Sequence, residues 1–85
     1  MQITYTRNFQ KAFKNLPSNI QDFAEDKEKL FRVNPFHSSL RTHKLMGKQK
    51  GYWSFSINYS YRILFKFTNN LTVEFLDIGT HQIYK

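Results

Sequence analysis

Residues 53–76 read WSFSINYSYRILFKFTNNLTVEFL, a stretch in which apolar and polar side chains alternate with a period of two. This period is typical of half-buried β-strands, because successive side chains of a strand point to opposite faces. Tyr59-Ser60 and Thr68-Asn69-Asn70 interrupt the alternation with residues that favour turns. The stretch therefore predicts three hairpin-connected antiparallel strands. Their odd-numbered side chains should form an aromatic core face, and their even-numbered side chains should form a polar face.

The residues before this meander predict one strand and two helices. Gln2–Tyr5 alternates like a short strand, and Thr6 can cap the helix that follows. Pro17 ends that helix, because the residue before a proline is disfavoured in the α region. Residues 18–21 match the S-x-x-Q capping box and open a second helix, which Asn34-Pro35 closes. We expect a two-layer α+β fold in the order β-α-α-β-β-β, with a helical hairpin packed on an antiparallel sheet.

Composition limits the class of protein. The chain has 85 residues, of which 40% are hydrophobic and 18% are aromatic, and it contains no cysteine. This predicts one globular domain, residues 1–85, without a disulfide, a thiolate metal site or a cysteine nucleophile. No apolar run approaches the roughly 20 residues that span a bilayer, and the N-terminus lacks the apolar segment of a signal peptide. We expect a soluble protein of a reducing compartment such as the cytoplasm.

Positive charge is unevenly distributed along the chain. Thirteen Lys and Arg against six Asp and Glu give a net charge of +7. Most of the acidic residues lie within residues 22–28, whereas residues 29–73 contain no carboxylate at all. A long basic stretch without acids is typical of a surface that binds nucleic-acid phosphates. The alternatives are an acidic protein partner, or a basic protein that self-repulsion keeps soluble.

Histidine and arginine residues near the predicted polar face are the best candidates for chemistry. His81 follows the last strand, Arg62 lies on the middle strand, and His43 precedes the meander, where it can meet His81 at one end of the sheet. Histidine can act as acid or base near neutral pH and arginine can stabilise a phosphorane, so these residues suit metal-independent cleavage of RNA. Each has a structural alternative: hydrogen bonding in the C-terminal turn for His81, solvation for His43, and an ion pair with Glu74 for Arg62. The histidines show no metal-binding spacing, so we predict no metal site.

Three motifs carry a resemblance to a known family. They are His43-Lys44-Leu45-Met46-Gly47, Tyr61-Arg62-Ile63-Leu64-Phe65 and Gly79-Thr80-His81. With these motifs, nearly the whole chain resembles the RelE/ParE superfamily of bacterial type II toxins, in particular its YafQ-like and RelE-like ribonucleases. The resemblance implies the same fold and an mRNA interferase that cleaves codons in the ribosomal A site. It also implies a cognate antitoxin that silences the toxin.

The resemblance further implies roles for individual residues. His81 falls on the catalytic histidine of YafQ-like enzymes, and His43 falls on the histidine that precedes their L-x-G element. Arg62 matches the central-strand arginine of RelE-like and YoeB-like members. Ser56 and Ser60 occupy the positions at which YafQ-like enzymes carry a further histidine and an aspartate. This chain therefore has fewer acid–base residues than those enzymes.

The resulting functional prediction is a ribosome-dependent endoribonuclease toxin that needs no cofactor, with His81, Arg62 and His43 as its catalytic residues. The residues predicted to bind mRNA or the ribosome are Arg41, Lys44, Lys48, Lys50, Lys66 and Tyr84. The predicted partners are an acidic, amphipathic antitoxin, the ribosome and mRNA, and no membrane. The toxin alone should be a monomer, and by family analogy a heterotetramer forms with the antitoxin. The alternatives are a ParE-like inhibitor of DNA gyrase and a degenerate toxin that acts only by binding.

Overall fold

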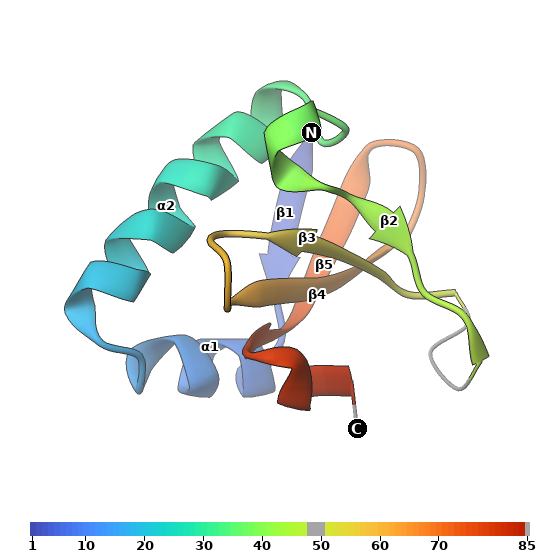
Figure 1. Cartoon of the computed structure of the whole chain (residues 1–85). Coiled ribbons are helices and arrows are strands. Elements are labelled where there is room, and N and C mark those ends of the chain that lie inside the picture. The colour runs from blue at the N-terminus through green and yellow to red at the C-terminus, as the bar shows by residue number, and fades with distance from the viewer. Residues whose placement is uncertain (48–50, 85) are drawn as a thin grey trace.

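A computed structural model describes residues 1–47 and 51–84, and within them five strands form one sheet in the order β1-β5-β4-β3-β2. The strands are β1 (Gln2–Tyr5), β2 (His43–Lys44), β3 (Trp53–Ser56), β4 (Arg62–Phe67) and β5 (Thr72–Gly79). Two helices, α1 (Arg7–Lys14) and α2 (Ser18–Val33), meet at a short turn and diverge from it along one side of the sheet (Figure 1). Short 3-10 helices lie at Ser38–Leu40 and at His81–Tyr84. The predicted two-layer α+β fold is confirmed.

The meander of β3, β4 and β5 is antiparallel, as predicted, but β1 joins β5 in parallel. Ile3 lies opposite Val73 in this pairing, and the backbone amide of Gln2 donates to the carbonyl of Leu71 at 2.8 Å. A parallel neighbour requires a long crossover between the two strands. Here the whole of α1 and α2, together with the first two meander strands, separates β1 from β5. The expectation of a wholly antiparallel sheet is therefore corrected at this one edge.

The opposite edge of the sheet carries a strand that the sequence pattern did not indicate. His43–Lys44 lies between the second helix and the meander, where the predicted order has no element, and pairs with Ser54 and Trp53 of β3 in antiparallel register. Two residues are too few to show a period of two, so hydrophobic alternation has nothing to detect here. This short strand matters for the site, because it brings His43 onto the sheet.

Strand β5 contains an irregularity that changes which of its side chains face the core. Leu64 lies opposite Asp77, whereas the next residue, Phe65, lies opposite Phe75, so one extra residue of β5 is accommodated between these two pairs. A bulge of this kind shifts the alternation by one residue. Ile78 consequently packs into the core at 3% exposure, although its even number would place it on the polar face.

The turn between the helices is stabilised differently from the sequence prediction. Thr6 caps α1 as expected, because its hydroxyl accepts the amide of Phe9 at 3.0 Å. The predicted capping box of α2 is wrong: Pro17 is the N-cap residue and makes no side-chain cap hydrogen bond. Gln21 instead donates its side-chain amide to the carbonyl of Phe13 at 2.9 Å. It therefore satisfies the C-terminal end of α1 rather than the start of its own helix.

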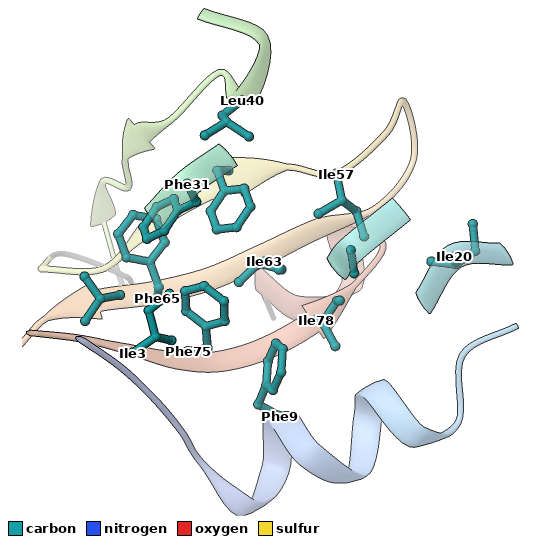
Figure 2. Close-up of a cluster of buried hydrophobic side chains, with 13 residues drawn as sticks. Ile3, Phe9, Ile20, Phe31, Leu40, Ile57, Ile63, Phe65, Phe75 and Ile78 are labelled. Carbon is teal, nitrogen blue, oxygen red and sulfur yellow. The ribbon is translucent and has the colours of Figure 1, made fainter. Parts of the chain in front are cut away.

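The core lies between the helices and the sheet and is dominated by phenylalanine rings (Figure 2). Phe31 of α2 is fully buried and contacts one ring from each meander strand, Phe55, Phe65 and Phe75, with centroid distances of 4.6, 5.0 and 5.6 Å. Offset and edge-to-face ring pairs of this kind add to the free energy gained by burial. The odd-numbered face of β3 and β4 thus forms the core, as the alternation predicted.

A polar cluster links the first strand to the second helix. The phenol of Tyr5 donates to the carboxylate of Glu28, and Arg32 donates to Glu28 at 3.1 Å and to the Tyr5 oxygen at 3.2 Å. Burial and the neighbouring Glu28 carboxylate raise the pKa of the Tyr5 phenol, whereas the Arg32 guanidinium acts in the opposite direction. The phenol therefore remains a hydrogen-bond donor at neutral pH and holds β1 against α2.

No helix within residues 1–47 and 51–84 is long and apolar enough to span a bilayer.

Candidate functional site

The sheet face opposite the helices, which we call the polar face, is partly covered by the end of the chain. Ser54 and Ser56 lie on this face as the alternation predicted, yet Ser54 is fully buried and Ser56 is 8% exposed. The hydroxyl groups of Ser54 and Tyr84 are hydrogen-bonded at 2.6 Å, which holds the C-terminal 3-10 helix against the sheet. A Cβ at Gly79 would lie 2.9 Å from the side chain of Ile83, so glycine permits this close approach. Tyr84 thus has a structural contact in addition to its predicted role in binding RNA.

His81 and Arg62 line one hollow at the edge of the polar face. The hollow has a volume of about 400 Å³, and Tyr59, Ser60 and Thr80 complete its lining. We call it the His81 hollow. The register explains the arrangement, because Arg62 lies directly opposite Gly79, two residues before His81. The His81 side chain is exposed, and its ring makes no hydrogen bond within the described part of the chain. The structure therefore brings together two of the three predicted catalytic residues.

Arg62 is held in place by the backbone of the hairpin between β3 and β4. Its Nη1 donates to the carbonyls of Asn58 at 3.0 Å and of Tyr59 at 3.3 Å. The ion pair with Glu74 that we considered for Arg62 does not form; Glu74 pairs instead with Lys66, at 3.5 Å. A guanidinium has five N–H donors, so anchoring through Nη1 leaves further donors for a ligand. Arg62 is thus positioned without a carboxylate that would neutralise its charge.

His43 lies on the polar face but does not line the His81 hollow. It sits on β2 directly opposite Ser54, and directly opposed residues of an antiparallel pair project to the same face. Its Nδ1 lies 3.0 Å from the carbonyl oxygen of Arg41. Among the described residues no hydrogen bond joins His43 to His81: His43 lies opposite Ser54, which bonds to Tyr84, whereas His81 shares its hollow with Arg62.

The residues predicted to bind RNA do not form a single cluster. Lys44 lies opposite Trp53, with its ammonium 5.9 Å from the centre of the indole, and so projects to the face opposite to that of His43. Lys66 is engaged with Glu74 on β5. Lys48 and Lys50 lie outside the described residues. Arg41 is exposed and lines a second hollow that adjoins the first.

This second hollow, which we call the Lys27 hollow, has a volume of about 520 Å³ and lies between α2, the Ser38–Leu40 helix and the hairpin that joins β3 to β4. In Figure 1 that hairpin reaches toward α2. The side chains that give the hollow its chemical character are Lys27, Ser39, Arg41, Ser56, Tyr59 and Arg62. Sequence reasoning gave Lys27 no role beyond complementing the dipole of the second helix, and it placed Tyr59 in a turn. Only the tertiary arrangement brings them to Arg62. The one available signal was Tyr59 itself, an aromatic residue at a turn position where the core does not need it.

Within the described residues, no group of three or more His, Asp or Glu side chains is arranged to hold a metal ion. The site consists of cations, hydroxyls, an imidazole and an exposed phenol ring. Such groups bind and polarise anionic esters.

The sequence of this chain matches a family model over most of its length. The family is described as RelE-like toxin of type II toxin–antitoxin system HigB, and the match covers residues 5–79. The chain belongs to this family. Comparison with curated proteins gives no match.

Solved structures of YafQ and YoeB proteins share the fold of this RelE-like toxin. YafQ from E. coli strain BL21(DE3) superimposes with a TM-score of 0.81 at 20% identity, covering 98% of this chain and 96% of that one. The YoeB/ParE toxin from Agrobacterium tumefaciens gives 0.78 at 18% identity, with 95% and 99% covered. The YoeB–YefM complex from Staphylococcus aureus gives 0.75 at 16% identity, with 95% and 97% covered. At these identities the likeness establishes the fold, and it confirms the RelE-like architecture that the sequence motifs implied.

Proposed function

We propose that this RelE-like toxin is an endoribonuclease that cleaves mRNA in the A site of the ribosome and so inhibits translation. The observation that supports the proposal is the His81 hollow, in which an exposed imidazole and an anchored guanidinium line the same space. An acid–base group beside a fixed positive charge is the combination that transesterification of a phosphodiester requires.

In the proposed reaction, the 2′-hydroxyl attacks the adjacent phosphorus. The 2′-oxygen loses its proton to a base and forms the new P–O2′ bond, while the P–O5′ bond breaks and the departing 5′-oxygen takes up a proton. The products are a 2′,3′-cyclic phosphate and a 5′-hydroxyl. His81 carries one of the two proton transfers, and Arg62 stabilises the negative charge that accumulates on the phosphorane. His43 assists from β2, which lies two strands away from the Arg62 strand in the sheet. No metal ion or cofactor takes part in this scheme.

The proposed partners are the ribosome, mRNA and a cognate antitoxin, and the proposed compartment is the cytoplasm. The net charge of +7 favours both RNA and an acidic antitoxin segment. Two of the similar structures are complexes of a toxin with an antitoxin, DinJ–YafQ from E. coli and YoeB–YefM from Staphylococcus aureus, the second of them a heterotetramer. By analogy, we propose that a cognate antitoxin binds this toxin and silences it. We also propose that the free toxin is a monomer, and that Arg41, Lys44, Lys66 and Tyr84 contact RNA.

The test is primer extension on a reporter mRNA in a reconstituted translation reaction, with and without ribosomes. We expect wild-type toxin to cut at A-site codons only when ribosomes are present. His81→Ala should slow cleavage by about 10²–10⁴-fold, the usual contribution of an acid–base group. His37→Ala is the matched control, because His37 is exposed, bonds to Ser39 and lies outside the hollow. Equal cleavage by wild type and His81→Ala would remove the central claim.

The same preparation separates the ribonuclease from the gyrase inhibitor. A DNA supercoiling assay with purified gyrase should show no inhibition by the toxin. Inhibition of gyrase together with intact mRNA would replace the proposed function by the ParE-like alternative. The absence of both gyrase inhibition and mRNA cleavage would favour a degenerate toxin.

A further inference from the structure

We propose that the Lys27 hollow is a second phosphate-binding site, which holds a neighbouring phosphodiester of the RNA strand that is cleaved at the His81 hollow. The inference rests on the proposed function and extends it from one reacting phosphate to a positioned strand. It assigns a role to Lys27 and to Ser56.

The charge of the hollow selects an anion. Lys27, Arg41 and Arg62 converge on it from α2, from the turn before β2 and from β4, and no carboxylate lines it. The ion pairs found among the described residues, Arg32–Glu28 and Lys66–Glu74, involve none of these three cations. Three cations without counter-charges repel one another, and a bound anion relieves that repulsion.

A largely buried serine forms part of the lining. Ser56 is only 8% exposed, yet its hydroxyl finds no hydrogen-bond partner in the part of the chain that the structure describes. It lines the hollow beside Arg62, its direct partner across the sheet. No fully buried side-chain oxygen or nitrogen among the described residues lacks a hydrogen-bond partner, so the Ser56 hydroxyl is accessible from the hollow. It can donate its proton to a phosphate oxygen bound there.

The backbone around the hollow is built to hold these groups in place. Arg41 adopts the left-handed conformation, with φ of 52°, and is the sole non-glycine residue with positive φ in residues 1–47 and 51–84. This conformation costs energy for a residue with a side chain and persists where the surrounding structure enforces it. On the other side of the hollow, the side chain of Asn58 accepts the amides of Ser60 at 2.9 Å and Tyr61 at 2.8 Å, which fixes the hairpin that carries Tyr59.

The two hollows share part of their lining, which favours a strand over an isolated anion. Tyr59 and Arg62 line both of them, so a ligand in one meets the same guanidinium as a ligand in the other. Tyr59 is 96% exposed at the tip of the hairpin between them, and single-stranded RNA stacks its bases on exposed aromatic rings. A single strand of RNA presents both phosphates and bases, so its phosphates can contact the cations while a base stacks on the Tyr59 ring.

The experiment measures RNA binding without cleavage, in toxin that carries His81→Ala. Binding of a labelled single-stranded RNA of about ten nucleotides is followed by fluorescence anisotropy. Salt is varied from about 50 to 200 mM. The slope of log K against log salt is negative, and each lost phosphate contact lowers its magnitude by about 0.7. We expect Lys27→Ala to weaken binding and to lower the magnitude of the slope by this amount, and Lys27→Arg to restore both.

Lys29→Ala is the matched control, since it removes the same charge from the exposed surface of the same helix but does not line the hollow. Equal slopes for Lys27→Ala and Lys29→Ala would overturn the inference and leave the proposed function intact. RNA that fails to bind the parent protein at all would overturn the inference alone, because cleavage that requires ribosomes does not require affinity for free RNA. A second arm replaces the oligonucleotide with ribosomes that lack mRNA. An effect of Lys27→Ala confined to ribosomes would assign the phosphate to ribosomal RNA and contradict the same-strand site.

Discussion

At the level of single residues, the hydroxyl pair of Ser54 and Tyr84 holds the end of the chain on the polar face. Ser54 is fully buried, so removal of its partner leaves a polar group that water cannot reach. Tyr84→Phe should lower the free energy of unfolding by about 1–3 kcal/mol, the usual cost of a buried group left unsatisfied. Urea denaturation followed by fluorescence measures the change. Tyr52→Phe, which removes a phenol hydroxyl with no hydrogen bond among the described residues, should leave stability nearly unchanged.

The double variant sharpens this result. If the bond is the cause, adding Ser54→Ala to Tyr84→Phe should recover much of the lost stability, because no buried hydroxyl then remains unpaired. Additive losses in the two single variants and the double variant would show that the two hydroxyls act independently. That outcome would contradict the assigned role of the contact.

Single residues also show how far sequence reasoning reaches into the site. His81 and Arg62 were predictable, because the alternation of residues 61–67 places Arg62 on the polar face and His81 closely follows the neighbouring strand. The place of Lys27 in the site was not predictable, because a lysine on a helix is usually exposed to solvent and the local pattern does not distinguish Lys27 from such residues. Its place in the site depends on the angle at which α2 crosses the sheet, and local periodicity carries no information about that angle.

At the level of elements, the turn between α1 and α2 depends on Gln21 rather than on a capping box. Gln21→Ala removes the hydrogen bonds to the last carbonyls of α1 and should lower the free energy of unfolding by about 0.5–1.5 kcal/mol. Alanine is at least as good a helix former as glutamine, so propensity does not explain a loss. Ser18→Ala should change stability by no more than about 0.5 kcal/mol. Urea denaturation of both variants is the measurement. A loss of about 1 kcal/mol in Ser18→Ala with none in Gln21→Ala would restore the capping box.

The elements that sequence patterns predicted are those whose periodicity spans several residues. The three meander strands, α1 and α2 all belong to this group. Strand β2 was missed because two residues cannot show a period, and the far half of β5 was missed because its bulge breaks the alternation after Phe75. The consecutive apolar pair Phe75-Leu76 was a visible sign of that irregularity. The parallel pairing of β1 depends on the path of the crossover, which no local pattern records.

At the level of the whole molecule, one ring connects the two layers. Phe31 reaches from α2 to all three meander strands, and its full burial makes it the point at which helix packing and sheet packing depend on each other. A domain of this size buries a limited core and has little stability in reserve. The free energy of unfolding should therefore depend more on Phe31 than on Phe23, the exposed aromatic residue of the same helix.

Phe31→Ala should lower the free energy of unfolding by about 3–5 kcal/mol, as expected for a phenylalanine removed from a packed core. This is a large fraction of the about 5–15 kcal/mol that stabilises a typical domain. Phe23→Ala is the matched control, since Phe23 lies on the same helix but is 47% exposed, and it should lose about 1 kcal/mol or less. Thermal and urea unfolding of both variants, followed by circular dichroism, give the comparison. Similar losses in the two variants would mean that α2 is held by its whole length rather than by the contact of Phe31 with the three strands. In that case the two layers would not depend on each other at this single ring.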